Sequence, residues 1–381
     1  MTINRNEYYV RPVNGNDSTG DGLSHATAWL TTVHAMETIT IDLTDGDRIN
    51  ICDEGTDTLT GILPFSTYGS HTNNAAGIVF EGYTATAGDG GIFTIDGNGY
   101  PITPNLTDGD FITFQNGKIT NWGQWGFACQ IDDYCFFVNM EFDGTKSGTN
   151  CSKALSLGSY CHITGCKFHN LSDTSAGCIY VNTGGHIVNN YIEASANPVV
   201  RLYTGLFVTG NIIINSRSSA SECIEFRNGR EGSVRNNTLI RNGGGTGQAI
   251  GVYHTDAIYS SQLSVINNYI EGYSGVGAKG VYVTSGAGNN YVSNNYYHNC
   301  TTAEDLSGSA IYERKGPTIL SPDSGLIDWA NGDFRPVKAL IGEAETSQFL
   351  TTGTTRSVDV GAVQRARGAI GGPNMQAGRA R

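Results

Sequence analysis

The amino-acid sequence predicts an all-β protein: a single-stranded, right-handed parallel β-helix with a short N-terminal capping helix. Three observations predict this solenoid, namely two short strand-like segments that recur together, a period of two within each segment, and a scarcity of helical patterns. The first segment places two small or polar residues before apolar ones, and its copies begin 21–31 residues apart. These copies begin at Gly165, Asn189, Gly210, Asn236, Asn267 and Asn294.

The second segment is apolar at alternate positions and recurs out of phase with the first. Its copies begin at Ala154, Cys178, Val199, Cys223, Ala249 and Gly280. Because no amphipathic helix fits between the two segments, leucine-rich and ankyrin-type repeats are poor matches. Asn suits the corners of a coil, since it tolerates left-handed backbone and can hydrogen-bond to its equivalent one coil along. A β-sandwich or propeller with chance regularity is the alternative fold.

Composition agrees with a solenoid and argues against some functional classes. The 381 residues include 51 glycines, and only 15% of residues are charged, which suits turns and polar strand faces. The formal net charge of −12 argues against a nucleic-acid partner. The same charge disfavours polyanionic substrates unless a local basic patch or a cation intervenes.

The cysteines and the first residues bear on the compartment. The first seven residues contain no apolar run, so the sequence predicts no signal peptide and no membrane insertion. The nine cysteines include no CxxC pair, and several stand where a small apolar residue would serve. We expect free buried thiols, with a Cys161–Cys166 disulfide as the alternative. Assembly in a host cytoplasm is therefore expected, and a secreted extracellular protein is the alternative.

The repeats divide the chain into three predicted regions. These are an N-terminal cap over 1–60 with a helix over 26–38, the parallel β-helix over 61–315, and a C-terminal cap with a basic Gly/Arg tail over 316–381. The loop 14–21 carries oxygens compatible with Ca²⁺, but it lacks the EF-hand pattern. We interpret this loop as a turn and predict no cofactor, with Ca²⁺ as the weaker alternative.

Two stretches at the ends resemble a known family. The run YYVRPVNGNDSTGDGLSHATAWLTTVHAM (8–36), followed by DGDRINI (45–51), resembles the opening of many pectate-lyase-like β-helix proteins. The stretch from Asp333 to Arg365, DFRPVKAL through SVDVGAVQR, resembles their closing segment. That superfamily includes bacterial polysaccharide-degrading enzymes and bacteriophage tail spikes, in which this helix caps the open end of the solenoid. The resemblance implies a fold more than an activity, because the fold hosts lyases, hydrolases, binders and structural spikes.

Outward side chains on the strands of such a fold stack into columns about 4.8 Å apart. Side chains along a strand alternate between inward and outward, and in the second segment this alternation predicts two outward columns. One column is Ser156, Tyr180, Arg201, Glu225, Gly251 and Tyr282, and the other is Gly158, Asn182, Tyr203, Arg227, Tyr253 and Thr284. Tyrosine stacks on sugar rings, and arginine binds hydroxyls or carboxylates. The candidate substrate-binding residues are therefore Tyr180, Asn182, Tyr203, Tyr253 and Tyr282. A structural ladder, in which the carboxylate pairs with a neighbouring arginine, is the alternative.

The candidate catalytic residues on this face are Glu225, Arg201 and Arg227. Glycoside hydrolysis generally needs two carboxylates, and here Glu222 lies near Glu225 in sequence. The resemblance also implies elimination by an Arg or Lys base with acids that hold Ca²⁺. No Asp cluster accompanies the two arginines, which puts lyase activity in doubt.

The first segment offers a second candidate catalytic column, Asp143, His169 and Glu193. A histidine between two carboxylates can act as a general base or bind a metal. A surface charge ladder is the preferred interpretation, and no metal site is predicted.

Ile212, Ile214 and Ile240 are predicted to point outward as an apolar patch. Water does not favour such a patch, so a loop or another subunit should cover it. Since phage spikes of the resembling family are usually trimers, these residues are the candidate interface of a homotrimer.

The sequence as a whole favours a bacteriophage virion protein, a spike, fibre or capsid appendage that binds polysaccharide. Its expected partners are polysaccharide and other virion proteins, the latter through the C-terminal tail. The alternatives are an active polysaccharide depolymerase, whether a lyase or a glycoside hydrolase, and a purely architectural spike.

Overall fold

The structure of the chain is a computed structural model. It describes residues 6–336 except for 40–45, 65–76, 104–110, 124–126, 132, 146–150, 152, 174–176, 218–220, 228–230, 243–245, 254–261, 285–289, 307–318, 322–323, 325 and 332. The basic tail predicted beyond Arg365 lies outside the described residues. The chain divides into two compact units, unit 1 (Met1–Arg201) and unit 2 (Leu202–Arg381). Within the described ranges, no helix combines the length and the apolar character needed to cross a membrane.

The N-terminal helix is present, but it is shorter than the predicted 26–38. Helix α1 spans Thr32–Thr38, and the side chain of its N-cap, Thr31, accepts a hydrogen bond from the His34 amide. The preceding residues are held in other contacts, because Asp17 Oδ1 accepts from the Leu30 amide at 2.7 Å and Trp29 pairs with the first strand. The carboxylate of the loop 14–21 thus positions the start of the helix, which agrees with the turn interpretation.

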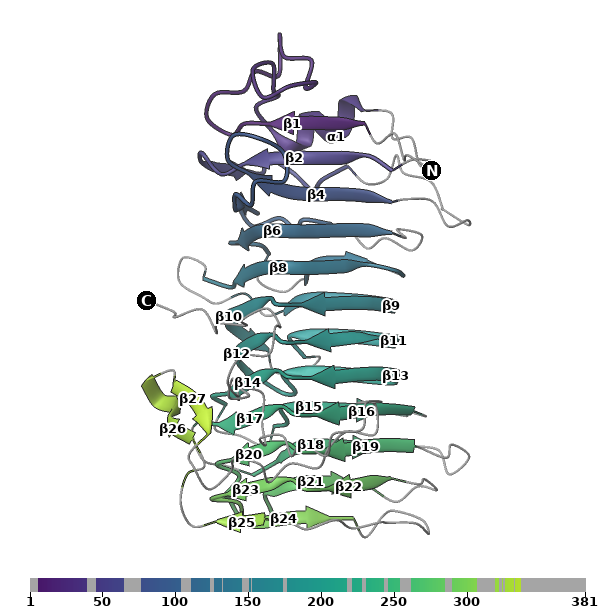
Figure 1. Cartoon of the computed structure of the whole chain (residues 1–381), viewed down its shortest axis with the longest axis vertical. Coiled ribbons are helices and arrows are strands. Elements are labelled where there is room, and N and C mark those ends of the chain that lie inside the picture. The colour runs from purple at the N-terminus through teal and green to yellow at the C-terminus, as the bar shows by residue number, and fades with distance from the viewer. Residues whose placement is uncertain are drawn as a thin grey trace, which may run out of the picture. The chain divides into compact units, whose positions relative to one another are not determined.

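Unit 1 is a stack of parallel strands (Figure 1). Strands β1, β2, β4, β6 and β8 follow one another in parallel register, and β10 and β12 continue from the second half of β8. The strands of this unit are β1 (Glu7–Val10), β2 (Arg48–Cys52), β3 (Thr56–Thr58), β4 (Ile78–Tyr83), β5 (Phe93–Asp96), β6 (Ile112–Thr120), β7 (Phe127–Ile131), β8 (Phe136–Asp143), β9 (Lys153–Thr164), β10 (Lys167–Asp173), β11 (Ile179–Val188) and β12 (Tyr191–Ala196). Strand β13 (Val200–Thr209) begins at the end of this unit.

Unit 2 carries three parallel columns of strands, β13–β16–β19–β22, β14–β17–β20–β23–β25 and β15–β18–β21–β24. Their bounds are β14 (Ile212–Asn215), β15 (Ile224–Arg227), β16 (Glu231–Arg235), β17 (Thr238–Arg241), β18 (Gln248–Tyr253), β19 (Gln262–Ile266), β20 (Tyr269–Glu271), β21 (Lys279–Val283), β22 (Tyr291–Ser293), β23 (Tyr296–His298), β24 (Thr302–Asp305) and β25 (Ile319–Ser321). An antiparallel pair, β26 (Leu326–Asp328) and β27 (Asp333–Pro336), encloses the short 3₁₀ helix η2 (Trp329–Asn331) and lies beside β20 (Figure 1).

The corners explain why Asn and Gly recur. The first residue of each two-residue corner has a left-handed backbone, with φ between +52° and +70° at Gly165, Asn189, Gly210, Asn236, Asn267 and Asn294. The second residue is buried, and in unit 2 its side chain bonds to the equivalent asparagine one coil along. The left-handed backbone and the hydrogen bond to the next coil, both expected of one corner asparagine, therefore belong to two neighbouring residues.

The interior follows the predicted parity. The alternate apolar residues of the second segment are all buried, among them Leu155, Ile179, Ile224, Ile250 and Val281. In unit 1 the Phe80, Phe114 and Phe137 rings stack along the coils with centroids 4.7 and 5.6 Å apart. All nine cysteines are free thiols, and eight of them are buried. The core is thus built by stacking like residues in successive coils.

Candidate functional site

One predicted face of unit 2 is assembled as the sequence indicated. Strand register places Glu225 beside Gly251, and Gly251 beside Tyr282, in one column. Arg227 pairs with Tyr253 in the neighbouring column. We call the group Glu222, Glu225, Arg227, Tyr253 and Tyr282 the Tyr253 surface.

The Tyr253 surface contains a closely held ion pair. Arg227 Nε donates to Glu225 Oε1 within the same strand. Glu225 is only 3% exposed, whereas the side chain of Arg227 is 49% exposed. The hydrogen bond to Glu225 raises the pKa of Arg227 above its already high value, so this guanidinium stays charged. The pair therefore presents hydrogen-bond donors to solvent while its carboxylate stays buried.

A second carboxylate, that of Glu222, accepts a hydrogen bond from Tyr253. The Tyr253 hydroxyl is 2.6 Å from Glu222 Oε1 and 2.8 Å from Gln248 Oε1. Glu222 is 9% exposed, and burial together with this carboxylate raises the pKa of Tyr253. The phenol is therefore a neutral hydrogen-bond donor at physiological pH. Sequence parity did not select Glu222, because it precedes β15 rather than lying on its outward column.

The surface continues along the next coil. Lys279 Nζ lies 3.7 Å from the centroid of the Tyr282 ring and 2.6 Å from Asp305 Oδ2. The rings of Tyr253 and Tyr282 meet edge to face, with centroids 6.0 Å apart. Tyrosine faces, charged donors and buried carboxylates thus occur together on adjoining strands of one unit.

The remaining residues of the predicted face differ in how far they are exposed to solvent. Asn182 is exposed, and Tyr180 and Tyr203 are half-buried. Arg201 was predicted to point outward with them, but it is only 8% exposed. In unit 1 the backbone of Gly177 lies close against it, since a Cβ on that glycine would be 3.3 Å from Arg201 Cβ. Arg201 is therefore poorly placed to act as a base on a bound substrate.

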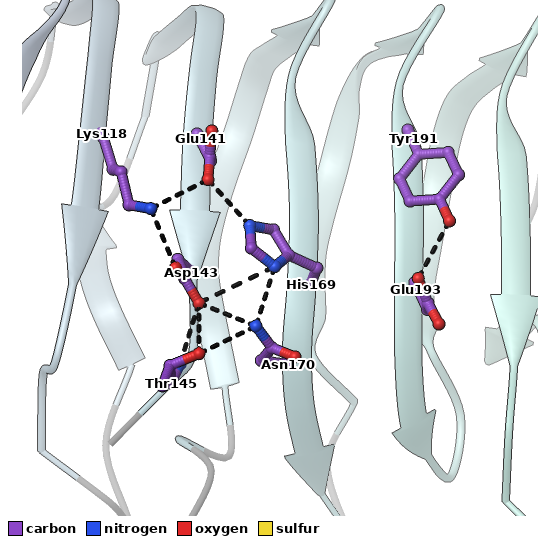
Figure 2. Close-up of polar contacts among 8 residues, drawn as sticks. All are labelled: Lys118, Glu141, Asp143, Thr145, His169, Asn170, Tyr191 and Glu193. Atoms are coloured by element: carbon purple, nitrogen blue, oxygen red, sulfur yellow. Dashed lines mark hydrogen bonds and ion pairs between the residues drawn. The ribbon is translucent and has the colours of Figure 1, made fainter. Parts of the chain in front are cut away.

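The second predicted column, in unit 1, forms a polar cluster that includes an additional lysine (Figure 2). Lys118 Nζ lies 3.0 Å from Glu141 Oε1 and 2.9 Å from Asp143 Oδ2. His169 Nε2 lies 2.9 Å from Glu141 Oε1, and Asn170 Nδ2 lies 2.9 Å from His169 Nδ1. Both ring nitrogens of the histidine therefore have partners within the cluster.

Electrostatics in this cluster favour fixed ionised groups. Burial alone would raise the pKa of Asp143, but hydrogen bonds from Asn170, Lys118 and Thr145 outweigh it and hold the pKa well below its usual value. For Lys118, burial alone would lower the pKa, but hydrogen bonds to its two carboxylate partners, Asp143 and Glu141, outweigh burial and raise the pKa.

The same cluster offers one ligand atom each from Glu141, Asp143 and His169, all within 4.8 Å of one another. A cation would fit this donor set by charge. Lys118 already supplies the positive charge that a metal would bring, however, and Asn170 already bonds to Nδ1 of the His169 imidazole. The arrangement therefore favours the charge-ladder interpretation over a metal site or a general base.

Glu193 does not join this cluster, contrary to the predicted column. It accepts a hydrogen bond of 2.9 Å from the hydroxyl of Tyr191 in its own strand (Figure 2). The pairing of β10 with β12 shifts register between Phe168 and Leu171, where Asn170 has a left-handed backbone with φ of +56°. One extra residue of β10 therefore lies opposite Glu193, between the Phe168–Ile192 and Leu171–Ala194 pairs.

Comparison with known proteins identifies the fold. A family model described as the right handed beta helix region matches residues 154–320. The chain is a right-handed parallel β-helix. No curated protein matches the sequence. The β-helix is similar to the solved structure of a GH136 lacto-N-biosidase from Eubacterium ramulus, with 11% identity, 83% of this chain and 68% of that chain covered, and a TM-score of 0.41. It is also similar to a rhamnogalacturonan lyase, with 14% identity, coverage of 91% and 96%, and a TM-score of 0.41.

The apolar patch predicted on the β-helix is wrong at two of its three positions. Ile214 and Ile240 are buried within the chain, and Ile212 is half-buried. Trp329 Nε1 donates to Glu271, the residue that pairs with Ile240, at 2.8 Å. The C-terminal segment around η2 therefore lies against this face, and of the three predicted interface residues only Ile212 is partly exposed.

Proposed function

We propose that the β-helix binds polysaccharide through the Tyr253 surface of unit 2. The observation that carries this proposal is the hydrogen bond from Tyr253 to the buried Glu222, next to the exposed Arg227 and its buried partner Glu225. Sugar hydroxyls both donate and accept hydrogen bonds, so they match the exposed guanidinium of Arg227 and the half-buried phenol of Tyr253. The apolar face of a sugar ring matches a tyrosine ring.

The test is affinity electrophoresis of the purified chain in gels that contain neutral or acidic bacterial polysaccharides. Retardation by at least one polysaccharide is expected, and Tyr253→Ala and Tyr282→Ala should each weaken it about ten-fold or more. Tyr100→Ala is the matched control, because Tyr100 is 41% exposed and lies in unit 1. Equal retardation of the two unit 2 variants and the wild type would contradict the proposal.

The same carboxylates support glycoside hydrolysis as a second candidate. Hydrolysis needs a proton donor and a base or nucleophile, usually two carboxyl groups. The two candidate carboxyl groups are Glu225, which is paired with Arg227, and Glu222, which accepts a hydrogen bond from Tyr253. Elimination with Arg227 as the base is disfavoured, since its ion pair raises the pKa of that guanidinium.

Product analysis separates these chemistries. New reducing ends without ultraviolet absorbance from unsaturated ends would indicate a hydrolase, and both signals together would indicate a lyase. For a hydrolase, Glu222→Gln and Glu225→Gln should each reduce the rate about 100-fold or more. Polysaccharide binding with neither signal would leave the chain as a binding protein.

A virion role for this polysaccharide-binding protein is also proposed. It is supported by the nine free thiols, which suit assembly in a reducing cytoplasm. Detection of the chain in purified phage particles would test it, and secretion of the chain into culture medium by intact cells would contradict it. A homotrimer, and contact with other virion proteins through the tail 365–381, are part of the same proposal. Light scattering and tail truncation test them.

A further inference from the structure

A buried arginine of unit 2 connects two segments of the chain. Arg241 is the last residue of β17 and is only 3% exposed. Its guanidinium donates to three backbone carbonyl oxygens, those of Arg217 at 3.2 Å, Ser221 at 3.3 Å and Thr246 at 2.9 Å. The first two acceptors precede β15, and the third precedes β18. One side chain therefore ties together two segments that lead into neighbouring strands.

Both segments lead to the hydrogen-bond partners of Tyr253. Ser221 directly precedes Glu222, and Thr246 lies two residues before Gln248. The side chains of Glu222 and Gln248 approach the Tyr253 hydroxyl to 2.6 and 2.8 Å. The buried guanidinium therefore holds the main chain next to both residues that bond to the phenol.

Two further contacts fix the main chain at Glu222. Asn215 Nδ2 donates to the Glu222 carbonyl oxygen at 3.0 Å. The Tyr273 hydroxyl donates to Sγ of Cys223, the next residue along the chain, at 3.0 Å. Arg241 also lies over the Tyr273 ring, with its guanidinium carbon 5.5 Å from the ring centroid. Because Asn215, Cys223 and Tyr273 are fully buried, these contacts are shielded from water.

Gly247 allows the two segments to pack against each other. A Cβ at this glycine would lie 2.5 Å from both N and O of Ser221 and 3.0 Å from Arg241 Nη1. The backbone φ of Gly247 is +131°, a conformation that residues with a side chain rarely adopt. Its carbonyl oxygen accepts a hydrogen bond from the Lys279 amide at 3.0 Å, which connects this segment to β21. Close packing and the guanidinium therefore constrain the same two segments.

We propose that Arg241 is a positioning residue for the Tyr253 surface. It orders the two segments so that the Glu222 and Gln248 side chains hold the phenol in one orientation. This role rests on the polysaccharide binding proposed above for that surface. A phenol that is already oriented loses less conformational freedom when a sugar binds, so the ordered site binds more tightly. Arginine suits the role because its planar group carries five N–H donors, whereas lysine has three on one nitrogen.

The first measurement needs no sugar. In protein labelled with ¹³C at tyrosine Cζ, the resonance of Tyr253 is the one that Tyr253→Phe removes, and its chemical shift reports the hydrogen bonds of the phenol. Arg241→Met keeps a long side chain without donors and should change this shift. It should also speed hydrogen exchange of the amides in 221–223 and 246–248 about ten-fold or more, whereas the amides of β16 and β19, in another column of strands, should exchange as in the wild type.

The second measurement is affinity electrophoresis with neutral and acidic bacterial polysaccharides. Arg241→Met should weaken retardation about five-fold or more in the wild-type background, but less than about two-fold when Tyr253→Phe is already present. Arg241→Lys should fall between the wild type and Arg241→Met, and it provides the test if Arg241→Met does not fold. Arg235→Met is the matched control, since Arg235 ends β16, and retardation should stay within about two-fold of the wild type.

Two results would overturn the positioning role. One is an unchanged Tyr253 resonance together with unchanged amide exchange in the folded Arg241 variants. The other is an equal loss of retardation with and without Tyr253→Phe, because a residue that only stabilises the fold behaves in that way. Absence of retardation for the wild type would contradict the proposed polysaccharide binding instead, and the resonance and exchange data alone would then support or overturn the role of Arg241.

Discussion

The buried asparagine ladder of unit 2 allows a quantitative test of what holds the coils together. Asn237 is fully buried and makes side-chain hydrogen bonds in both directions along the stack. Its Oδ1 accepts from the Asn211 amide at 2.9 Å and from Asn211 Nδ2 at 3.0 Å. Its Nδ2 donates to Val208 O at 2.9 Å and to Asn268 Oδ1 at 3.0 Å. Asn237→Ala therefore removes four hydrogen bonds from the interior.

Each of these bonds contributes about 1 kcal/mol net, so the loss should destabilise the chain by about 4 kcal/mol. Asn237→Asp keeps the size of the side chain but places a second acceptor against Val208 O and Asn268 Oδ1, so it should destabilise the chain at least as much. Asn182→Ala is the matched control, since Asn182 is exposed, and it should change stability by less than about 0.5 kcal/mol.

Urea denaturation followed by far-ultraviolet circular dichroism measures these differences from the shift in midpoint. A repeat protein can lose coils separately, so hydrogen exchange of the amides in β14 and β17 would show whether the loss is local. A decrease below about 1 kcal/mol for Asn237→Ala, or equal effects of Asn237→Ala and Asn182→Ala, would refute the view that the ladder stabilises the corners.

Other predictions concern ionisable groups of unit 1. Lys118→Met removes the cation shared by Glu141 and Asp143, and it should lower the free energy of unfolding by about 1 kcal/mol, because these partly exposed pairs are screened. Added Zn²⁺ should then raise the Tm of this variant but not of the wild type, as measured by a thermal shift. The pKa of Asp143 is depressed in the folded chain, so its contribution to stability is present above about pH 4 and is lost as the pH falls further; urea midpoints should show this loss, and Asp143→Asn should abolish it. The pKa of His162 is lowered by burial and by His186, so the unfolded chain binds its proton more tightly and stability should fall as the pH drops below about 6.5, a dependence that His162→Phe should reduce.

Strand register and the interior were predictable because the information is local. A period of two assigns each strand residue to the inside or the outside, and recurring Asn and Gly mark the corners. These rules alone placed Glu225, Gly251 and Tyr282 in one column, and the structure pairs them so. They also predicted the buried positions of Ile224 and Ile250.

Three features of the candidate sites depended on information that periodicity does not carry. Glu193 bonds to Tyr191 in its own strand, opposite an extra residue of β10 that no repeat pattern marked. Glu222 lies before its strand begins, so no parity rule assigned it a direction. Ile240 is buried on a face that also receives Trp329, a contact between segments far apart in sequence.

The stacked rings of Phe111, Tyr134 and Tyr160 in unit 1 are difficult to explain by stability alone. A left-handed conformation costs about 1–2 kcal/mol for each of Phe111, Tyr134 and Tyr160, or about 3–6 kcal/mol together. The two ring stacks contribute about 0.5–1.5 kcal/mol each, or about 1–3 kcal/mol, and the half-exposed Tyr160 gains little more from burial. Asparagine at the same corners would avoid most of the strain, as it does at Asn139. The ring stacks therefore recover only part of what the left-handed backbone at these three residues costs.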